Sequence, residues 1–235
     1  MKISKIKNRG RLFSFDDISY SSFGNKSTHV YAIKASQHFF IFDTYMGPGF
    51  MQQVKNAMLH EFGQKPFIVI NSHYHWDHVF GNSAFSPEEI FCHKICREIM
   101  ETQYNAFDPQ SFDRYLAQYS FSLPEKQVEI VLPGVTFADS LSFCDEGIEL
   151  FYTPGHTIDC LSLYDRIDKV LCAGDNVELP YPTYFDEGNR ENHIKTLEKY
   201  LTMDTDTIIP GHDEILGKEA VKKNLEYRKN LWHKS

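Results

Sequence analysis

Short apolar runs recur along the chain, separated by segments in which apolar residues follow a helical spacing. Branched and aromatic residues dominate the runs, as is typical of buried strands. The predicted strands cover residues 29–33, 39–42, 67–70, 148–152, 161–164, 169–173 and 207–209. Strands that alternate with helices indicate a domain of mixed α and β structure.

Three other segments carry apolar side chains three, four or seven residues apart, which places them on one face of a helix. The stripes are Met51, Val54, Met58 and Phe62, then Ile194, Leu197 and Leu201, and finally Val221, Leu225 and Trp232. A helix that covers a sheet needs such a face. We therefore interpret the stripes as core-facing rather than as binding surfaces.

Length and charge limit the domain organisation and the partners. The chain has 235 residues, 42% of them hydrophobic, and a chain of this size can bury one large core. No linker, low-complexity tract or repeat divides it, so we predict a single domain over residues 1–235. The formal net charge of -8 disfavours nucleic-acid binding, because neutralising phosphates requires clustered Lys and Arg.

Targeting signals and cysteines bear on the compartment. Residues 1–10 are basic but lead into no apolar stretch of signal-peptide length, and no run elsewhere is long enough to span a bilayer. The five cysteines are odd in number and show no disulfide-like spacing, which favours buried thiols over a disulfide framework or a metal cluster. We therefore predict a cytoplasmic protein with no membrane partner.

One segment changes the picture. Residues 71–78 read Asn-Ser-His-Tyr-His-Trp-Asp-His, which places His73, His75, Asp77 and His78 directly after a predicted strand. Imidazole and carboxylate groups are the ligands that suit zinc, iron or manganese. The alternative interpretation is a polar loop that is rich in histidine.

Three distant residues weigh against that alternative. His156 in Thr-Pro-Gly-His, Asp175 in Ala-Gly-Asp and His212 in Pro-Gly-His each follow a predicted strand and a glycine. In α/β proteins the residues just past the carboxyl ends of strands converge on one edge of the sheet. We therefore expect all seven side chains to line one cleft.

This ordered set of motifs resembles the metallo-β-lactamase-fold hydrolases, whose signature is H-x-H-x-D-H followed by separate His, Asp and His ligands. The resemblance spans roughly residues 28 to 214, and every ligand position carries the expected residue type. It implies a four-layer αββα sandwich and a ligand set like that of glyoxalase II. The commonest secreted β-lactamases have Cys at the position of Asp175, so antibiotic hydrolysis is not favoured.

Local geometry and the resemblance together suggest a role for each ligand. Residues two apart in an extended segment share a face, so His73 and His75 can chelate one ion, with His156 as the third ligand. Asp77, His78 and His212 resemble the second site of the family. The resemblance implies that Asp175 bridges two divalent ions, with zinc as the default and iron or manganese not excluded.

A carboxylate outside the ligand set also follows a strand. Asp43 ends the run Phe-Phe-Ile-Phe-Asp and resembles the Asp-Thr-Gly turn of the family, although Tyr45 and Met46 precede Gly47 here. The functional interpretation is an acceptor for the ring N–H of a metal-bound histidine. A turn-capping aspartate is the alternative.

Candidates for substrate contact lie in two segments. Tyr181, Tyr184 and His193 follow the proposed bridging Asp175 and are candidates to line the cleft mouth, although loop packing is an equal interpretation. The aromatic-rich segment 100–121 would form an apolar lid if the fold brings it near the ligands.

The function that follows is hydrolysis by a binuclear metal centre. We expect a small-molecule substrate with an ester, thioester, lactone or amide-type bond, a hydroxide between two ions as the nucleophile, and Asp77 orienting that hydroxide. The alternatives are a mononuclear iron oxidoreductase of the persulfide dioxygenase type and a metal-binding relative without catalysis.

Overall fold

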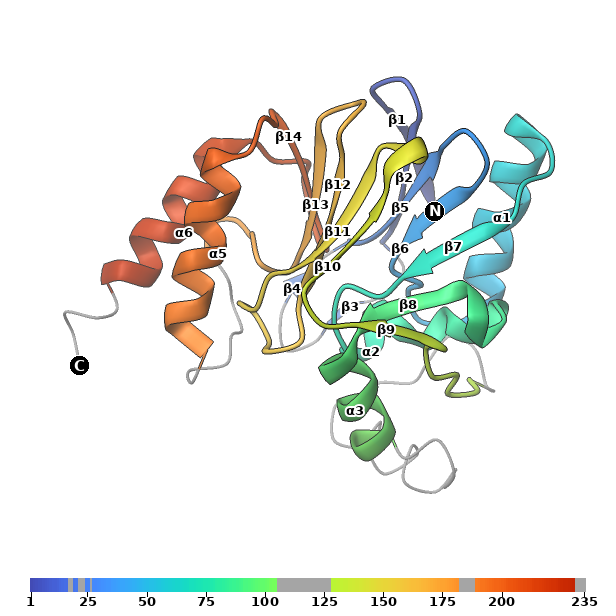
Figure 1. Cartoon of the computed structure of the whole chain (residues 1–235), viewed down its shortest axis with the longest axis horizontal. Helices are drawn as coiled ribbons and strands as arrows, with labels where there is room; N and C mark the ends of the chain where they lie inside the picture. The colour runs from blue at the N-terminus through green and yellow to red at the C-terminus, as the bar shows by residue number, and fades with distance from the viewer. Residues whose placement is uncertain (17–18, 21–23, 26, 105–127, 182–188, 231–235) are drawn as a thin grey trace.

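Two stacked β-sheets with helices on both outer faces form the fold (Figure 1). The structure is a computed structural model that describes residues 1–16, 19–20, 24–25, 27–104, 128–181 and 189–230. The predicted αββα sandwich is confirmed. No helix in these ranges is both long enough and apolar enough to cross a membrane.

The first sheet has seven strands in the order β1-β2-β5-β6-β7-β8-β9. Its strands are β1 (Lys2–Ile6), β2 (Gly10–Phe15), β5 (Thr28–Lys34), β6 (Phe39–Phe42), β7 (Phe67–Ile70), β8 (Ile90–His93) and β9 (Val135–Phe137). Pairing is antiparallel from β1 to β6 and parallel from β6 to β9. Strands β3 (Ser19–Tyr20) and β4 (Gly24–Asn25) form a separate antiparallel pair.

The second sheet has five strands in the order β10-β11-β12-β13-β14. They are β10 (Ser140–Phe143), β11 (Ile148–Tyr152), β12 (Leu161–Asp165), β13 (Val170–Gly174) and β14 (Thr207–Pro210). Pairing is antiparallel except between β13 and β14, which run parallel. The first sheet therefore contains three parallel pairs and the second contains one.

The longer helices cover the outer faces, whereas short helix α2 (Trp76–Val79) carries the ligand candidates Asp77 and His78. The longer helices are α1 (Pro48–Phe62), α3 (Lys94–Gln103), α5 (Arg190–Thr202) and α6 (Lys218–Asn230). Pro48 suits the first turn of α1, where its missing N–H has no partner to lose. Figure 1 shows α5 and α6 beside β14, and α1 on the far side of the molecule.

Strand alternation divides the core into layers. Phe39 and Ile41 of β6 pack with Met51, Val54 and Met58 of α1, so the first predicted stripe is core-facing. Each such side chain stabilises the fold by about 1.5–3 kcal/mol when it leaves water.

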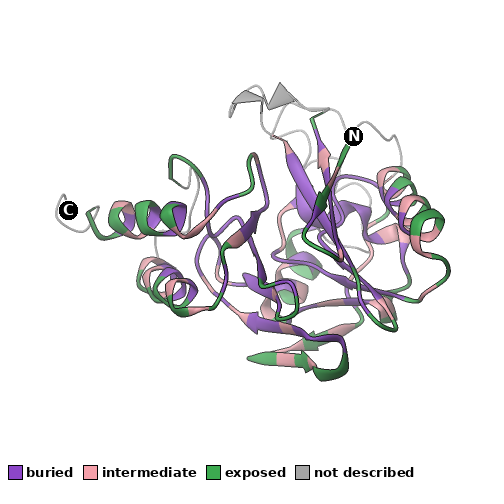
Figure 2. Cartoon of the chain, turned by 90° about the horizontal axis from the view of Figure 1, so that it is seen from above, coloured by how far each residue is buried: buried purple, intermediate pink, exposed green. Residues whose placement is uncertain are grey.

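The other faces of the strands fill the space between the sheets. Phe40 and Phe42 of β6 pack with Leu150 of β11 and Leu161 of β12. A third cluster joins the second sheet to α5 and α6 through residues such as Leu197. Figure 2 shows this pattern, with buried strands inside and exposed faces on the helices.

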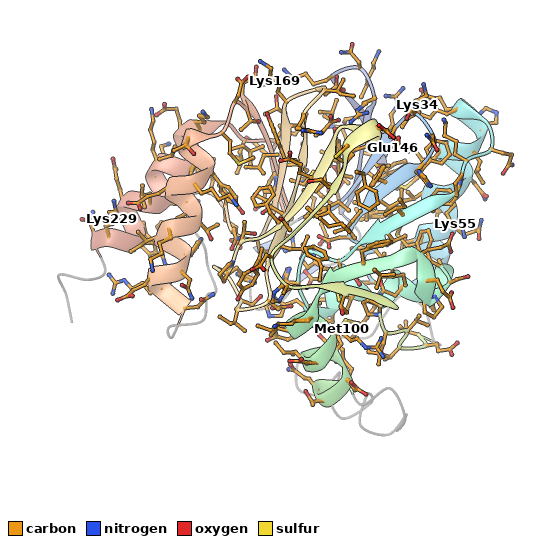
Figure 3. All side chains as sticks on the ribbon, viewed as in Figure 1. Lys34, Lys55, Met100, Glu146, Lys169 and Lys229 are labelled. Carbon is orange, nitrogen blue, oxygen red and sulfur yellow. The ribbon has the colours of Figure 1, made fainter. Side chains whose placement is uncertain are left out.

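The lysines labelled in Figure 3 include several on the outer surface. Lys34, Lys169 and Lys229 are exposed and project outwards (Figure 3). The five cysteines are free thiols, buried except for Cys144, which agrees with the expected absence of a disulfide framework.

The carboxyl ends of β6 and β7 in the first sheet and of β13 and β14 in the second sheet meet at one edge. The Asp43 N–H donates to the Ile70 carbonyl at 2.8 Å, and the Gly211 N–H donates to the Gly174 carbonyl at 3.0 Å. The Leu161 N–H donates to the Ser72 carbonyl at 2.8 Å and so ties the sheets together there. This edge is where the ligand candidates lie.

Candidate metal centre

Four of the ligand candidates follow β7 closely in the sequence. His73 and His75 lie in the short link after the strand, and Asp77 and His78 belong to α2. All but His75 are buried, and His75 is partly buried. The ring centroids of His73 and His78 lie 4.4 Å apart, so the strand-end histidines and the helix residues face a common space.

Three nitrogens converge in the first group. His73 Nε2 lies 2.9 Å from His75 Nδ1, and His156 Nε2 lies 3.1 Å from the same atom. His156 comes from the loop after β11, so the group draws on both sheets. Together with Asp175, these ligand atoms lie within 4.8 Å of one another.

The second group consists of Asp77, His78 and His212. Asp77 Oδ2 lies 3.6 Å from His78 Nε2 and 3.4 Å from His212 Nε2. His212 follows β14, so this group also combines the two sheets.

Asp175 stands between the groups. Its Oδ1 lies 3.4 Å from His78 Nε2. Its Oδ2 lies 3.3 Å from His212 Nε2 and 3.6 Å from His156 Nε2. One carboxylate therefore contacts ligands of both groups, which is the geometry that a bridging ligand requires.

The donor set fits divalent metal ions. His78 Nε2 and Asp175 Oδ1 are buried, and neither has a hydrogen-bond partner among the described residues. Burying such atoms without a hydrogen bond is costly, and cation binding would satisfy both. A β-carbon on Gly211 would overlap Asp175 Oδ1, so the backbone there leaves room for the carboxylate.

Comparison with known proteins agrees with this geometry. The model of the metallo-β-lactamase superfamily matches residues 24–212. The chain belongs to this superfamily. Solved metallo-β-lactamases share its fold: DIM-1 has a TM-score of 0.74 at 18% identity, with 98% of this chain and 97% of that chain covered. The enzyme from Pontibacter korlensis has a TM-score of 0.74 at 17% identity, with 97% and 99% covered.

Curated relatives of this superfamily member include two named hydrolases. An acyl-coenzyme A thioesterase, MBLAC2 of Gallus gallus, is 22% identical over 89% of this chain and 80% of its own length. An N-acyl homoserine lactonase of Bacillus cereus is 28% identical over 67% of this chain and 61% of its own length. The chain spans about half the length of two other relatives, from Aspergillus versicolor and Caenorhabditis elegans, at 46% and 48%.

Burial and neighbouring charges shift the pKa values of the ligand side chains in different directions. Burial, with neighbouring histidines, holds the pKa values of His73 and His75 well below their usual range. Burial alone would lower the pKa of His212, but Asp175 raises it to about 9. Burial would raise the pKa of Asp175, but His212 and His78 hold it well below its usual range. His212 must therefore lose a proton before Nε2 can bind a cation.

Asp43 supports two histidines of the superfamily ligand set. Its Oδ2 accepts hydrogen bonds from His78 Nδ1 at 2.9 Å and from the Ser72 hydroxyl at 2.8 Å. The same hydroxyl lies 2.9 Å from His73 Nδ1. These bonds use the Nδ1 atoms and turn both Nε2 atoms toward the centre. Because Ser72 and His78 lie outside the turn of Asp43, the contacts favour the supporting interpretation over a turn cap.

The structure places two of the three predicted substrate contacts, and their surroundings differ. His193 is completely buried, and its Nε2 donates to the Asn176 carbonyl at 2.9 Å. Its burial argues against a substrate contact, because no ring edge is open to solvent. Tyr181 is 42% exposed but stacks on Tyr227 of α6, with ring centroids 4.1 Å apart. Tyr184 lies outside the described residues.

Only the start of the predicted lid segment can be described. Met100 of α3 and Tyr104, which ends that helix, are buried in the core cluster that also contains residues of α1. The Tyr104 hydroxyl donates to the Tyr74 carbonyl at 2.6 Å, next to His73 and His75. Residues 105–121 of this segment lie outside the described residues.

Sequence reasoning missed a buried carboxylate that contacts two of the segments carrying ligand candidates. Asp159 is completely buried, and it accepts hydrogen bonds from the Tyr74 N–H at 2.8 Å and from the Thr157 hydroxyl at 2.6 Å. It therefore joins the His73–His75 link to the loop of His156. The only signal in the sequence was its place three residues after a predicted ligand.

Proposed function

We propose that this chain is a binuclear metal-dependent hydrolase of a small molecule with an ester, thioester, lactone or amide-type bond. The observation that carries the proposal is the position of Asp175, whose two oxygens contact ligands of both groups. A centre for a single ion would leave Asp77, His78 and His212 without a role. The relatives named as a thioesterase and a lactonase support an activated carbonyl as the reacting group.

The chemistry follows from the donor set. Two divalent ions held by these residues would supply a water of lowered pKa and would polarise the substrate carbonyl. His73, His75 and His156 would hold the first ion, Asp77, His78 and His212 the second, and Asp175 both. Zinc suits this mixture of imidazole and carboxylate ligands, and iron or manganese suits it as well.

The protein's own residues prepare the attack. Asp77 is 7% exposed and directs Oδ2 towards the space between His78 and His212. In the proposal this carboxylate accepts a hydrogen bond from the attacking water and so fixes the direction of its lone pair. Asp43 keeps His78 in the required orientation through the bond to Nδ1.

Elemental analysis of the purified wild-type protein and of His75→Ala and Asp175→Ala tests the proposal. We expect about two zinc or manganese ions per wild-type chain and fewer in both variants, with greater loss in Asp175→Ala because Asp175 touches both groups. Hydrolysis is then measured on acyl-thioesters, lactones, esters and amides. A single iron per chain with O₂ uptake would favour the oxidoreductase, and full metal loading without hydrolysis would favour a binding protein.

A further inference from the structure

The loop that carries His156 is held by the side chain of Asn176, which directly follows Asp175. Asn176 is completely buried. Its Oδ1 accepts a hydrogen bond from the His156 N–H at 2.8 Å. Its Nδ2 donates to the Thr153 carbonyl at 2.8 Å and to the Tyr200 hydroxyl at 3.1 Å. One amide therefore joins the strand end of Asp175 to the loop of His156.

Helix α5 holds the same loop from the other side. His193 Nε2 donates to the backbone carbonyl of Asn176 at 2.9 Å. Asn189 Nδ2 donates to the carbonyls of Gly155 and Thr157, at 3.1 and 3.0 Å. A β-carbon on Gly155 would lie 2.8 Å from His193 Cδ2 and would overlap Asn176 Oδ1. The loop is thus pressed against the amide with no room for a side chain.

We propose that Asn176 is a positioning residue that fixes His156 relative to Asp175 and thereby sets the metal affinity of the first group. The inference rests on the metal centre of the proposed function. His156 Nε2 lies 3.1 Å from His75 Nδ1 and 3.6 Å from Asp175 Oδ2. Metal–ligand distances in well-formed sites hold to within about 0.2 Å. A shift of the loop away from Asn176 would change both distances.

The chemistry of the contact requires an amide. The His156 N–H needs an acceptor and the Thr153 carbonyl needs a donor, and one asparagine supplies both. Aspartate at this position would keep the acceptor but set an oxygen against the Thr153 carbonyl. Alanine would leave both buried backbone groups unpaired.

A matched asparagine elsewhere in the chain provides a control for purely structural effects. Asn224 of α6 is also completely buried. Its Oδ1 accepts from the Glu178 N–H at 2.9 Å, and its Nδ2 donates to the Glu178 carbonyl at 2.6 Å. It makes the same pair of bonds to the backbone as Asn176, but not to a residue of the metal centre.

The test compares wild type, Asn176→Ala, Asn176→Asp and Asn224→Ala. Zinc affinity and stoichiometry are measured by competition with a chromogenic chelator, and the Tm of each metal-free protein by circular dichroism. We expect one zinc equivalent to bind about 10- to 100-fold more weakly in both Asn176 variants, the usual effect of losing a partner behind a ligand. Asn224→Ala should lower the Tm of the metal-free protein but bind zinc as tightly as wild type. The isosteric Asn176→Asp serves where the alanine variant does not fold.

Two other results would each overturn the inference. Wild-type zinc affinity in the Asn176 variants, together with a Tm loss like that of Asn224→Ala, would reduce Asn176 to a structural residue. A wild-type chain that takes up no zinc, iron or manganese would remove the metal centre itself. The second result also refutes the proposed function, whereas the first leaves it intact, so the two failures are distinguishable.

Discussion

Replacing Gly211 by alanine should weaken zinc binding by about 100-fold or more, although it adds only a methyl group. The new β-carbon would lie 2.8 Å from His78 Cε1, about 0.6 Å inside the 3.4 Å at which ordinary contact begins, and closer still to Asp175 Oδ1. Metal–ligand distances in well-formed sites hold to within about 0.2 Å. The required movement of the His78 ring is therefore about three times this tolerance, and Asp175 must move further.

The backbone cannot retreat to relieve the overlap. The Gly211 N–H donates to the Gly174 carbonyl at 3.0 Å, and its own carbonyl accepts from the His29 N–H at 2.8 Å. These bonds pin Gly211 between β13 and β5. The side chains of the metal centre must give way instead, so we expect zinc affinity to fall by at least about 100-fold.

Isothermal titration with zinc and elemental analysis of the purified protein measure the effect. Gly217→Ala is the control, because the nearest atom to its β-carbon is the Asp206 carbonyl oxygen at 3.6 Å, an ordinary contact. The control should bind zinc like wild type. Wild-type zinc affinity in Gly211→Ala would refute the reasoning, since it would mean that the ligand geometry is not set by the backbone at this position.

Three further predictions concern support, acidity and metal removal. Asp43→Ala should lower zinc affinity about 10- to 100-fold while the circular dichroism spectrum stays native, because His78 loses its Nδ1 acceptor; unchanged metal content on elemental analysis would contradict this. Burial would raise the pKa of Glu146, but hydrogen bonds from His38, Gln37 and Ser36 lower it below its ordinary 4.5. The unfolded chain then binds more protons, so this stabilisation is present above pH 4.5 and is lost as the pH falls through the lower folded value. The Tm advantage of wild type over Glu146→Gln (Figure 3) should therefore shrink below pH 4.5, and a constant difference down to pH 3 would count against it. Chelation with EDTA should lower the Tm, and zinc at about 1,000 times its Kd should restore about 4 kcal/mol of stability; an identical Tm in both states would exclude a bound ion that stabilises the fold.

The ligand candidates were predictable because each depends on local sequence. An apolar run followed by a turn and a polar residue marks the end of a strand. The ends of parallel strands lie at one edge of the sheet whatever the pairing register of the strands. The strands at 39–42, 67–70 and 148–152 have the predicted bounds. Those at 169–173 and 207–209 are shifted or extended by one residue.

Strands at the sheet edges were missed for a physical reason. In β1, four of the five residues are exposed or half-exposed, so the segment carries no apolar run. Strands β9 and β10 are also exposed or half-exposed along their length. Their pairing is fixed by backbone hydrogen bonds to a neighbour, and such bonds leave no trace in side-chain polarity.

Helix α5 shows where polarity misleads. The predicted stripe had Ile194, Leu197 and Leu201 facing the core, but Leu197 is the only one of them that is fully buried. The rest of the buried face is polar or aromatic, consisting of His193, Thr196 and Tyr200. Thr196 donates to the Pro154 carbonyl at 2.9 Å, beside His156. Burying a polar side chain costs little free energy only when it has a hydrogen-bond partner. Here the partner belongs to a loop that is distant in the sequence.

Both ligand groups combine residues from the two sheets. His73 and His75 follow β7 of the first sheet, whereas His156 follows β11 of the second. In the second group, Asp77 and His78 also follow β7, whereas His212 follows β14. An ion in either group would therefore join the sheets at the edge where the Leu161 N–H already bonds to the Ser72 carbonyl. Metal affinity and sheet packing must then be linked, because whatever separates the sheets at this edge also separates the ligands.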